Sequence, residues 1–213
     1  LSGRLGAARA HLQPFVPLKV NLTRGRGTGL WHLIDLAPSG SVDYPSRLAL
    51  PQLLCAQYLN ELLYYLLRQP QAEPRLFAAY LRTLELLSQG DTRAPLRAFE
   101  RELLACLGYE LQFRLPDGTR ARADTLYRFD VALGFRALRA GERADDGLCY
   151  RGAELAHLQE VCAGDLAGLQ DPWCLQALQH LYGSVIAMLL DGRKLQSRLL
   201  LRDYVRRCGR AVA

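Results

Sequence analysis

Residues 191–210 read Asp-Gly-Arg-Lys-Leu-Gln-Ser-Arg-Leu-Leu-Leu-Arg-Asp-Tyr-Val-Arg-Arg-Cys-Gly-Arg. Gly192 is expected to end the apolar helix that precedes this segment. Ser197 is suited to cap a new helix, because its side-chain oxygen can accept a hydrogen bond from a free backbone N–H. Cations then recur at every fourth position, as Lys194, Arg198, Arg202, Arg206 and Arg210. Four residues advance a helix by about 400°, so these side chains form one cationic stripe.

The predicted last helix also carries apolar residues that would hold it on a core: Leu195, Leu199, Tyr204, Val205 and Cys208. From Gly192 to Arg210 there are seven cations, Arg193 among them, and one acidic residue, Asp203. Two interpretations remain open. One is a solvated last helix with favourable cations near its C-terminus. The other is a face that binds anions.

The net charge of +6 is unevenly placed along the 213 residues. Residues 1–50 carry six cations and two acids, residues 51–150 carry thirteen of each, and residues 151–213 carry eight and six. The excess positive charge therefore lies at the two ends of the chain. A polyanionic partner such as nucleic acid is the natural inference.

Half of the residues are hydrophobic, which predicts a folded globular protein. Polar residues or glycine interrupt the apolar runs within about a dozen residues, so we expect no transmembrane helix and no membrane partner. The six cysteines form no Cys-x-x-Cys pair, and no histidine stands at zinc-ligand spacing from one. We therefore expect free thiols in the cytoplasm, with no metal site and no cofactor.

A period-two pattern lies near the N-terminus. Side chains 16, 18, 20 and 22 are apolar, residues 25–29 form a glycine-rich turn, and residues 30–36 continue as a second strand. The pattern predicts a β-hairpin with Arg24 and Arg26 at its tip. Two strands do not form a domain alone, so the hairpin either packs on helices or pairs with strands that this chain lacks.

Most of the remaining chain has a helical pattern. Residues 38–45 form a loop, and apolar spacing then predicts helices at 48–68, 74–88, about 92–107, 152–162 and 172–190. Gly108 suits the end of the third helix, and Asp171 followed by Pro172 suits the start of the fifth. Apolar residues are sparse in between, where we expect a small excursion with two short strands, at 127–129 and 134–138.

Several short motifs follow one another in a recognisable order. They are Leu12-Gln-Pro-Phe, Tyr58-Leu-Asn-Glu-Leu-Leu, Phe99-Glu, Leu103-Leu, Leu107-Gly-Tyr, Tyr127-Arg-Phe, Gly134-Phe and Gly192-Arg-Lys-Leu-Gln-Ser-Arg. In this order and spacing the chain resembles the bacterial recombination mediator family RecO, from about His11 to about Tyr204. The shared order of the motifs carries the resemblance.

The resemblance implies an α+β fold, with an N-terminal OB-fold followed by an all-α helical domain. Residues 1–44 then form the C-terminal part of an OB-fold that is incomplete in this chain, because about forty residues with the opening strands are not present. Residues 45–213 form the helical domain. Residues 109–150 form a small irregular or β insertion in place of the four-cysteine zinc module that many members carry. Since residues 109–127 contain no cysteine, we expect no zinc there.

The resemblance also implies a function in RecF-pathway DNA repair. Members bind single- and double-stranded DNA and anneal complementary strands. They act with RecR, sometimes with RecF, to help RecA load on strands coated by single-stranded-DNA-binding protein, whose C-terminal tail is a further partner. The expected location is the cytoplasm, in association with the nucleoid. The family's usual Pro-Leu-Lys-Ser-Arg motif stands here as Lys194-Leu-Gln-Ser-Arg, with the positive charge moved by two places.

Nine residues are the candidate DNA contacts: Lys19, Arg24, Arg26, Trp31, Arg193, Lys194, Arg198, Arg202 and Arg206. The cations suit a phosphate backbone, and Trp31 suits a base-stacking platform. The alternative role for Trp31 and Phe15 is barrel core. Because the excess charge lies at both ends of the chain, we hypothesise that the hairpin tip and the last helix form one continuous DNA track. The acidic tail of the strand-coating protein needs an apolar pocket rimmed by arginine, for which Arg75, Arg82 and Arg101 are equal candidates.

Two other classes of protein compete with this interpretation. An enzyme is not expected, because the sequence has no phosphate-binding loop, no Gly-x-Ser-x-Gly and no His-Glu-x-x-His. His11, His32, His157 and His180 are isolated, and the Asp145-Asp146 pair is typical of a solvated turn. No catalytic residue is proposed. A helical adaptor that binds only proteins would suit the neutral middle of the chain and remains the alternative.

Overall fold

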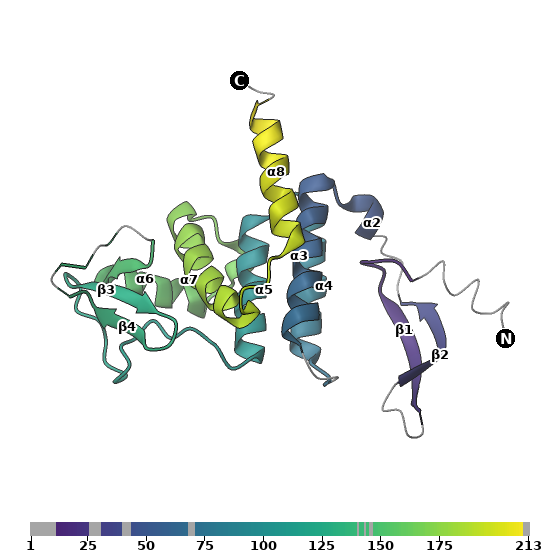
Figure 1. The fold of residues 1–213 in the computed structure, drawn as a ribbon, viewed down its shortest axis with the longest axis horizontal. Coiled ribbons are helices and arrows are strands. Elements are labelled where there is room, and N and C mark those ends of the chain that lie inside the picture. Colours follow the sequence, from purple (N-terminus) through teal and green to yellow (C-terminus); the bar gives the residue numbers. More distant parts are fainter. Residues whose placement is uncertain are drawn as a thin grey trace.

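A computed structural model describes residues 12–25, 31–39, 44–67, 71–139, 141–142, 144 and 147–210. Figure 1 shows a helical body with a β-hairpin at one end and a small β-sheet at the other. The elements are β1 (Leu18–Arg24), β2 (Trp31–Pro38), α2 (Tyr44–Arg47), α3 (Leu50–Leu66), α4 (Pro74–Ser88), α5 (Arg93–Cys106), β3 (Leu126–Asp130), β4 (Gly134–Ala137), β5 (Cys149–Arg151), α6 (Gly152–Ala163), η1 (Leu166–Gly168), α7 (Pro172–Leu190) and α8 (Gln196–Arg210). The α+β fold class is confirmed.

The hairpin pairs β1 with β2 in antiparallel register, from Leu18 opposite Pro38 to Arg24 opposite Trp31. The register shifts between Asn21 and Leu22, so β2 contributes one extra residue there. The shift matters because side chains alternate between faces along β1. It keeps apolar residues of both strands on one face: Leu18, Val20, Leu22, Trp31, Leu33 and Leu36.

The hairpin stands at the edge of the helical body and forms a two-stranded sheet of its own. Its apolar face is largely exposed, with Leu22 50% and Trp31 52% exposed. Buried residues flank it, because Phe15 before β1 and Tyr44 after β2 both belong to the hydrophobic core. The sequence left open whether the hairpin packs on the helices, and the described strands are exposed along most of their length.

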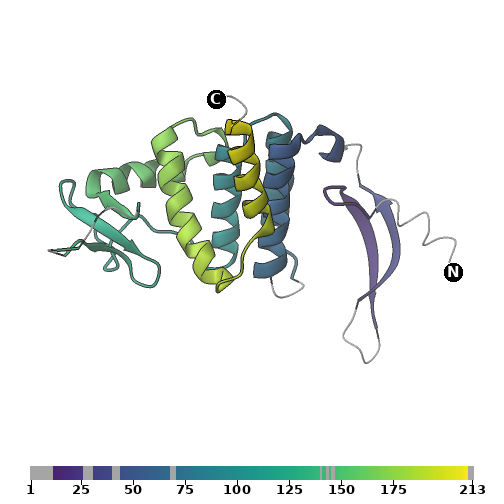
Figure 2. The same cartoon turned by 45° about the horizontal axis from the view of Figure 1, so that its top comes forward.

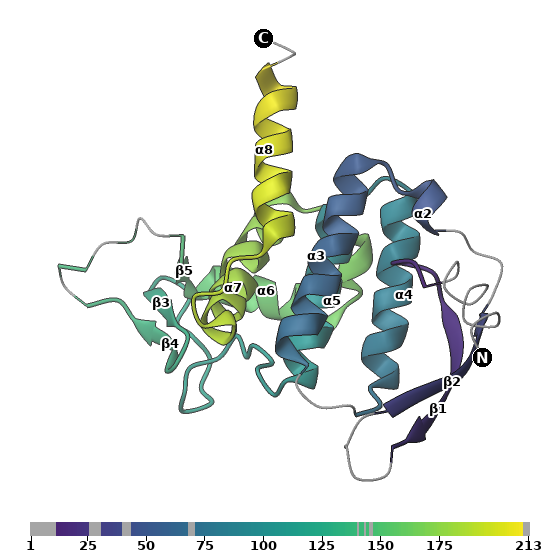
Figure 3. The ribbon, with the colours of Figure 1, turned by 45° about the vertical axis from the view of Figure 1, so that its right-hand side comes forward.

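The core lies among α3, α4, α5 and α7. Residues at helical spacing turn one face of each helix inward, and α5 packs against both α4 and α7. Fully buried side chains include Leu59 and Leu62 of α3, Leu84 and Leu87 of α4, Phe99 and Leu103 of α5, and Leu178 and Leu181 of α7. Figure 3 shows α3 and α4 side by side with α5 behind them.

Most of the predicted helix ends are confirmed. The second predicted helix matches α4, and the Asp171 side chain accepts hydrogen bonds from the first turn of α7. Gly108 follows α5 with a φ of +81°, and Gly192 follows α7 with a φ of +77°. Two boundaries were wrong. Pro45 lies inside the short helix α2 rather than in a loop, and the first long helix ends at Leu66.

The predicted β excursion is a three-stranded antiparallel sheet with the order β4-β3-β5. The two predicted strands are confirmed, and β5 was not predicted because it has only three residues. Phe135 is fully buried and packs on Phe129 and Tyr150, whose ring centroids lie 5.0 and 6.3 Å away. Gly152 joins β5 to α6, where an added Cβ would lie 2.1 Å from the Arg122 carbonyl oxygen.

One helix has a membrane-like composition. Within the described ranges, α7 is long and apolar enough to span a bilayer, with a mean hydropathy of 1.2. Half of that apolar window is buried inside the molecule. Its fully buried residues, such as Leu181 and Ile186, belong to the core, so α7 is a central helix of the fold.

Candidate nucleic-acid interface

The last helix, α8, is attached to α3 through Glu61. The Glu61 carboxylate accepts hydrogen bonds from the backbone N–H groups of Gln196 and Ser197 at 3.2 and 3.1 Å, and from the Ser197 hydroxyl at 2.6 Å. The sequence predicted that Ser197 caps α8, and this prediction was wrong. Ser197 is the second residue of the helix, and a carboxylate from another helix satisfies the free N–H groups instead.

Only the first part of the predicted apolar face holds α8 on the core. Leu195, just before the helix, is buried, and Leu199 and Tyr204 are half-buried. Val205 and Cys208 are exposed, so their predicted packing role was wrong. Figures 1 and 3 show the reason, because the C-terminal end of α8 rises beyond the ends of the helices that it packs on.

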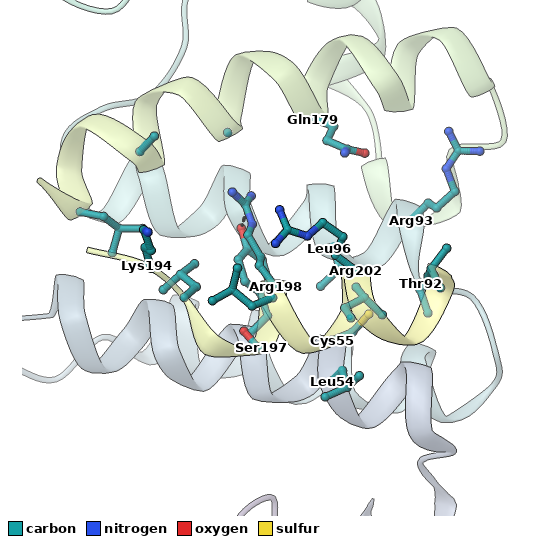
Figure 4. A pocket seen from close by; sticks show the side chains of 18 of the residues that line it. Leu54, Cys55, Thr92, Arg93, Leu96, Gln179, Lys194, Ser197, Arg198 and Arg202 are labelled. Carbon is teal, nitrogen blue, oxygen red and sulfur yellow. Dashed lines mark hydrogen bonds between the residues drawn. The ribbon is translucent and has the colours of Figure 1, made fainter. Parts of the chain in front are cut away.

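A cavity of about 980 Å³ lies where α8, α7 and α5 meet. In Figure 4, α7 forms one wall and α8 the other, and Gln179 of α7 faces the Arg198 and Arg202 side of the hollow. Apolar side chains such as Leu54, Leu96 and Leu175 contribute to its surface. The cavity is therefore amphipathic, with an apolar lining and a polar rim.

Cations dominate the charge around this cavity. The residues that line it include Arg93, Arg97, Arg193, Lys194, Arg198, Arg202 and Arg206. Among the described lining residues there is no carboxylate. Five of the nine candidate DNA contacts are thus brought together at one concave site, and the four-residue spacing along α8 accounts for three of them.

A buried polar network lies beneath the arginines. The Tyr58 hydroxyl donates to Glu100 Oε1 at 2.7 Å, and Arg97 donates to the same oxygen at 2.8 Å. Burial raises the pKa of Tyr58 well above its ordinary value, and the Glu100 carboxylate raises it further. Arg97 Nε and Glu100 Oε2 are buried without a hydrogen-bond partner among the described residues. The Arg97 guanidinium thus keeps one unsatisfied donor at the floor of the cavity.

Two arginines near the start of α8 rest on tyrosine rings of α3. The Arg198 guanidinium lies 5.0 Å from the Tyr58 ring centroid and donates to the Tyr58 hydroxyl at 3.2 Å. The Arg193 guanidinium lies 5.6 Å from the Tyr65 ring. Such cation–π contacts orient a guanidinium without neutralising it. Both residues are exposed, so their charge remains available to an anion.

The hairpin presents its candidate residues differently. Arg24 and Trp31 lie directly opposite each other and share the apolar face, and both are exposed. Lys19 lies opposite Ala37 and, by alternation along β1, points to the other face. Phe15 is buried and belongs to the hydrophobic core that the helices form, whereas Trp31 is exposed. Arg26 lies outside the described residues.

The hypothesis of one continuous track is not supported by the fold. In Figure 1 the turn end of the hairpin, marked by Arg24 and Trp31, lies at the bottom right, whereas α8 rises to the top. The views in Figures 2 and 3 keep the same separation. The helical body lies between the two surfaces, because α3 carries α8 and the hairpin stands beyond α2 and α4. The two cationic ends of the sequence therefore form two separate surfaces.

The arginines first considered for a peptide pocket lie elsewhere. Arg82 pairs with Asp165, and Arg101 donates to the carbonyl oxygens of Cys162 and Gly164 at 2.8 and 3.0 Å. Arg75 is exposed on α4 and does not line the cavity. The sequence analysis missed Arg93 and Arg97 of α5. Their four-residue spacing was a visible signal, but only the packing of α5 behind α8 shows that they join the cationic cluster.

The described histidines lie on three different elements. His32 lies on the exposed hairpin, and His180 lies on α7, 3.3 Å from the Gly147 carbonyl oxygen. His157 lies on α6 next to Asp171. Asp145, Asp146 and His11 lie outside the described residues. Of the described histidines, only His157 lies close to both a carboxylate and a thiol, those of Asp171 and Cys174.

Comparison of the sequence with those of known proteins identifies relatives of this chain. The family model for the C-terminal part of recombination protein O matches residues 47–199. "DNA repair protein RecO" of Methylococcus capsulatus is 36% identical over 204 residues, which cover 94% of this chain and 77% of the relative. Its namesake in Pseudomonas aeruginosa is 35% identical over 205 residues, covering 95% and 82%. The protein of that name from Coxiella burnetii is 32% identical over 199 residues, covering 91% and 79%.

The chain belongs to the RecO family. It is a protein of DNA repair and recombination, and the resemblance seen in its motifs is confirmed. The RecO family model spans α3 to the first turn of α8, so it includes both the Glu61 contact and most of the cavity lining. Residues 109–127 contain neither cysteine nor histidine, and this stretch therefore cannot supply the zinc ligands expected of many RecO proteins.

Proposed function

We propose that this chain is a DNA-binding recombination mediator that binds single- and double-stranded DNA and anneals complementary strands. The cationic wall of α8 carries this proposal, because it places Arg198, Arg202 and Arg206 in a row with no carboxylate among the described residues that line the cavity. Annealing requires little covalent chemistry. A cationic surface reduces the repulsion between two phosphate backbones and releases their counterions.

The hairpin is proposed as a second, weaker DNA contact. Arg24 and the exposed Trp31 share one face of the ribbon. An arginine beside an aromatic ring suits an unpaired strand, because the cation attracts a phosphate and the ring stacks on a base. Two separate surfaces would allow the protein to hold two strands at once, which is the arrangement that annealing requires.

The cavity is also the best site in the described chain for the C-terminal tail of single-stranded-DNA-binding protein. An acidic tail that ends in an aromatic residue needs an apolar floor and a cationic rim. Leu96 and Leu175 supply apolar lining, while Arg93, Arg198 and Arg202 supply cations. The unsatisfied Arg97 Nε adds a buried donor for a carboxylate. Through this tail the protein would act on coated strands, and with RecR it would help RecA to load.

Fluorescence anisotropy with a labelled single-stranded oligonucleotide tests the DNA proposal. The double variant Arg198→Glu/Arg202→Glu removes two phosphate contacts, each worth a slope of about 0.7 in log K against log salt. We expect affinity to fall roughly 50-fold at about 50 mM salt and the slope to decrease by about 1.4. The matched control is Arg75→Glu/Arg120→Glu, which makes the same charge change at exposed sites outside the cavity. Equal losses of DNA affinity in both variants would show that only the net charge of the protein matters, and would contradict a DNA site at the cavity.

Titration with a labelled acidic tail peptide tests the alternative function, an adaptor that binds only proteins. If α8 serves both ligands, the peptide and the oligonucleotide compete, and Arg198→Glu/Arg202→Glu weakens both. Binding of the peptide without binding of any oligonucleotide at low salt would favour the adaptor. We also propose that this chain has no enzymatic activity, that it works in the cytoplasm at the nucleoid, and that RecR and RecF are its partners.

A further inference from the structure

Three potential metal-binding side chains meet outside the DNA-binding surfaces. His157 comes from α6, while Asp171 and Cys174 come from the start of α7. The imidazole, carboxylate and thiol ligand atoms all lie within 4.8 Å of one another. His157 Nε2 is 3.4 Å from Asp171 Oδ2. The cluster is distant in sequence from residues 109–127, where the family's zinc module would lie.

The two oxygens of Asp171 have different partners. Oδ1 accepts the backbone N–H groups of Trp173 and Cys174 at 2.9 and 3.2 Å, which caps α7. Oδ2 faces His157 instead. Helix capping therefore uses one oxygen, and the second oxygen is directed toward the imidazole and the thiol.

An aromatic ring holds His157 in place, and two of the three ligands reach the surface. The Trp173 ring stacks on His157, with centroids 6.1 Å apart and an angle of 29° between the planes. Cys174 is fully buried, whereas the side chains of Asp171 and His157 are 38% and 49% exposed. The thiol thus forms the floor of the site and the other two groups form its rim, so an ion can enter from the rim.

The spacing suits a four-coordinate ion. Ligand atoms about 2.0–2.3 Å from a tetrahedral metal lie about 3.3–3.8 Å from one another. The 3.4 Å between His157 Nε2 and Asp171 Oδ2 falls in that range, and the separations to the Cys174 thiol are within 4.8 Å, which a side-chain adjustment on binding would close. A nitrogen, an oxygen and a sulfur ligand together favour Zn²⁺ or Co²⁺ over Mg²⁺ or Ca²⁺, which prefer oxygen alone.

We propose that His157, Asp171 and Cys174 form a binding site for a divalent transition metal ion of the Zn²⁺ class, with solvent as the fourth ligand. The ion would join α6 to the start of α7. The sequence analysis predicted no metal site because these ligands are 14 and 17 positions from His157 and match no zinc motif. Only the packing of α6 against the α7 N-terminus brings them together.

Titration of the full chain with Co²⁺ tests the site. Tetrahedral Co²⁺ with a thiolate ligand gives strong visible bands and a sulfur-to-metal charge-transfer band in the near ultraviolet. We expect these bands to saturate at one equivalent and to disappear when Zn²⁺ is added. Zn²⁺ should also raise the melting temperature, because it binds only the folded site.

Three variants locate the ion. Asp171→Asn retains an oxygen that caps α7 but replaces the ligating oxygen with an amide NH₂, so it should weaken Co²⁺ binding at least about tenfold without loss of fold. His157→Gln changes an exposed side chain and should likewise weaken Co²⁺ binding without loss of fold. Cys174→Ser should remove the charge-transfer band. Cys208→Ser and His32→Gln are matched controls at exposed sites and should change nothing. Absence of the bands in the wild type, or bands that survive Cys174→Ser and His157→Gln, would overturn the proposal.

Discussion

The hairpin and α8 both carry excess positive charge, yet the fold presents that charge in opposite ways. The hairpin is a thin ribbon whose two faces are both largely exposed, so its cations stand apart from one another. Helix α8 lies along a body of three other helices, which gives its cations a concave surface with an apolar floor. Excess positive charge therefore supports a loose contact in one region and a shaped site in the other.

The difference comes from what lies behind each element. At the start of α8, Tyr58 and Tyr65 of α3 hold Arg198 and Arg193 through cation–π contacts, and Glu61 fixes the first turn of the helix. On the hairpin, the Arg24 and Lys19 side chains are exposed. Fixing a long cationic side chain before an anion arrives reduces the entropy lost on binding. We therefore expect α8 to contribute more to affinity than the hairpin does.

The largest effect is expected from Glu61→Ala. This variant tests whether the contact between α3 and the start of α8 is what fixes the cations of α8 more firmly than those of the hairpin. The variant removes three hydrogen bonds from one carboxylate, so it should cost about 3 kcal/mol of stability at the start of α8. Hydrogen exchange should increase in residues 196–204 and remain unchanged in the hairpin. Glu73→Ala, on the segment before α4, is the control for loss of a carboxylate. Unchanged exchange in α8 would show that Glu61 does not anchor it.

Trp31→Ala sharpens the comparison from the hairpin side. Stacking is worth about 1–3 kcal/mol for each base, so the variant should weaken single-stranded DNA binding roughly tenfold. Duplex binding should change little, because paired bases do not offer a free face. The control is Ile34→Ala, which removes another exposed apolar side chain of β2. Equal losses for single- and double-stranded DNA would contradict a stacking role.

The smallest effect is expected from Tyr58→Phe, which probes the buried network under α8. Loss of the hydroxyl removes one hydrogen bond to Glu100 and one from Arg198, at a net cost of about 1 kcal/mol. Because the folded pKa of Tyr58 is raised, its contribution is present below its unfolded value of about 10 and is lost as pH rises above it. Chemical denaturation should show that the wild type has a higher free energy of unfolding than Tyr58→Phe at neutral pH, and that this difference shrinks at alkaline pH. A constant difference across pH would contradict the assignment.

The sequence predicted what depends on local pattern. The α+β class, the helix spacing, the Asp171 cap and the glycines after α5 and α7 were all readable because propensity and periodicity act over a few residues. The stripe on α8 was visible for the same reason. These features required no knowledge of how distant segments pack.

The sequence did not predict what depends on tertiary contacts. Glu61, and not Ser197, accepts the free N–H groups at the start of α8. It lies 136 positions before Ser197 in the sequence. The extra residue in β2 places Trp31 on the same face as Arg24, and the helical body separates the hairpin from α8. Arg93 and Arg97 join the cationic cavity only because α5 packs behind α8. Charge counts along a chain do not indicate which charges share a surface.

Photo-crosslinking tests the central claim, that the α8 side of the cavity is the main DNA surface, most directly. A short single-stranded oligonucleotide with photoreactive bases is bound to the full chain at low salt, and the crosslinked peptides are mapped by mass spectrometry. We predict crosslinks in residues 193–206 and 92–97, with fewer in the hairpin. Crosslinks confined to the hairpin, with none on α8 or the start of α5, would contradict the account.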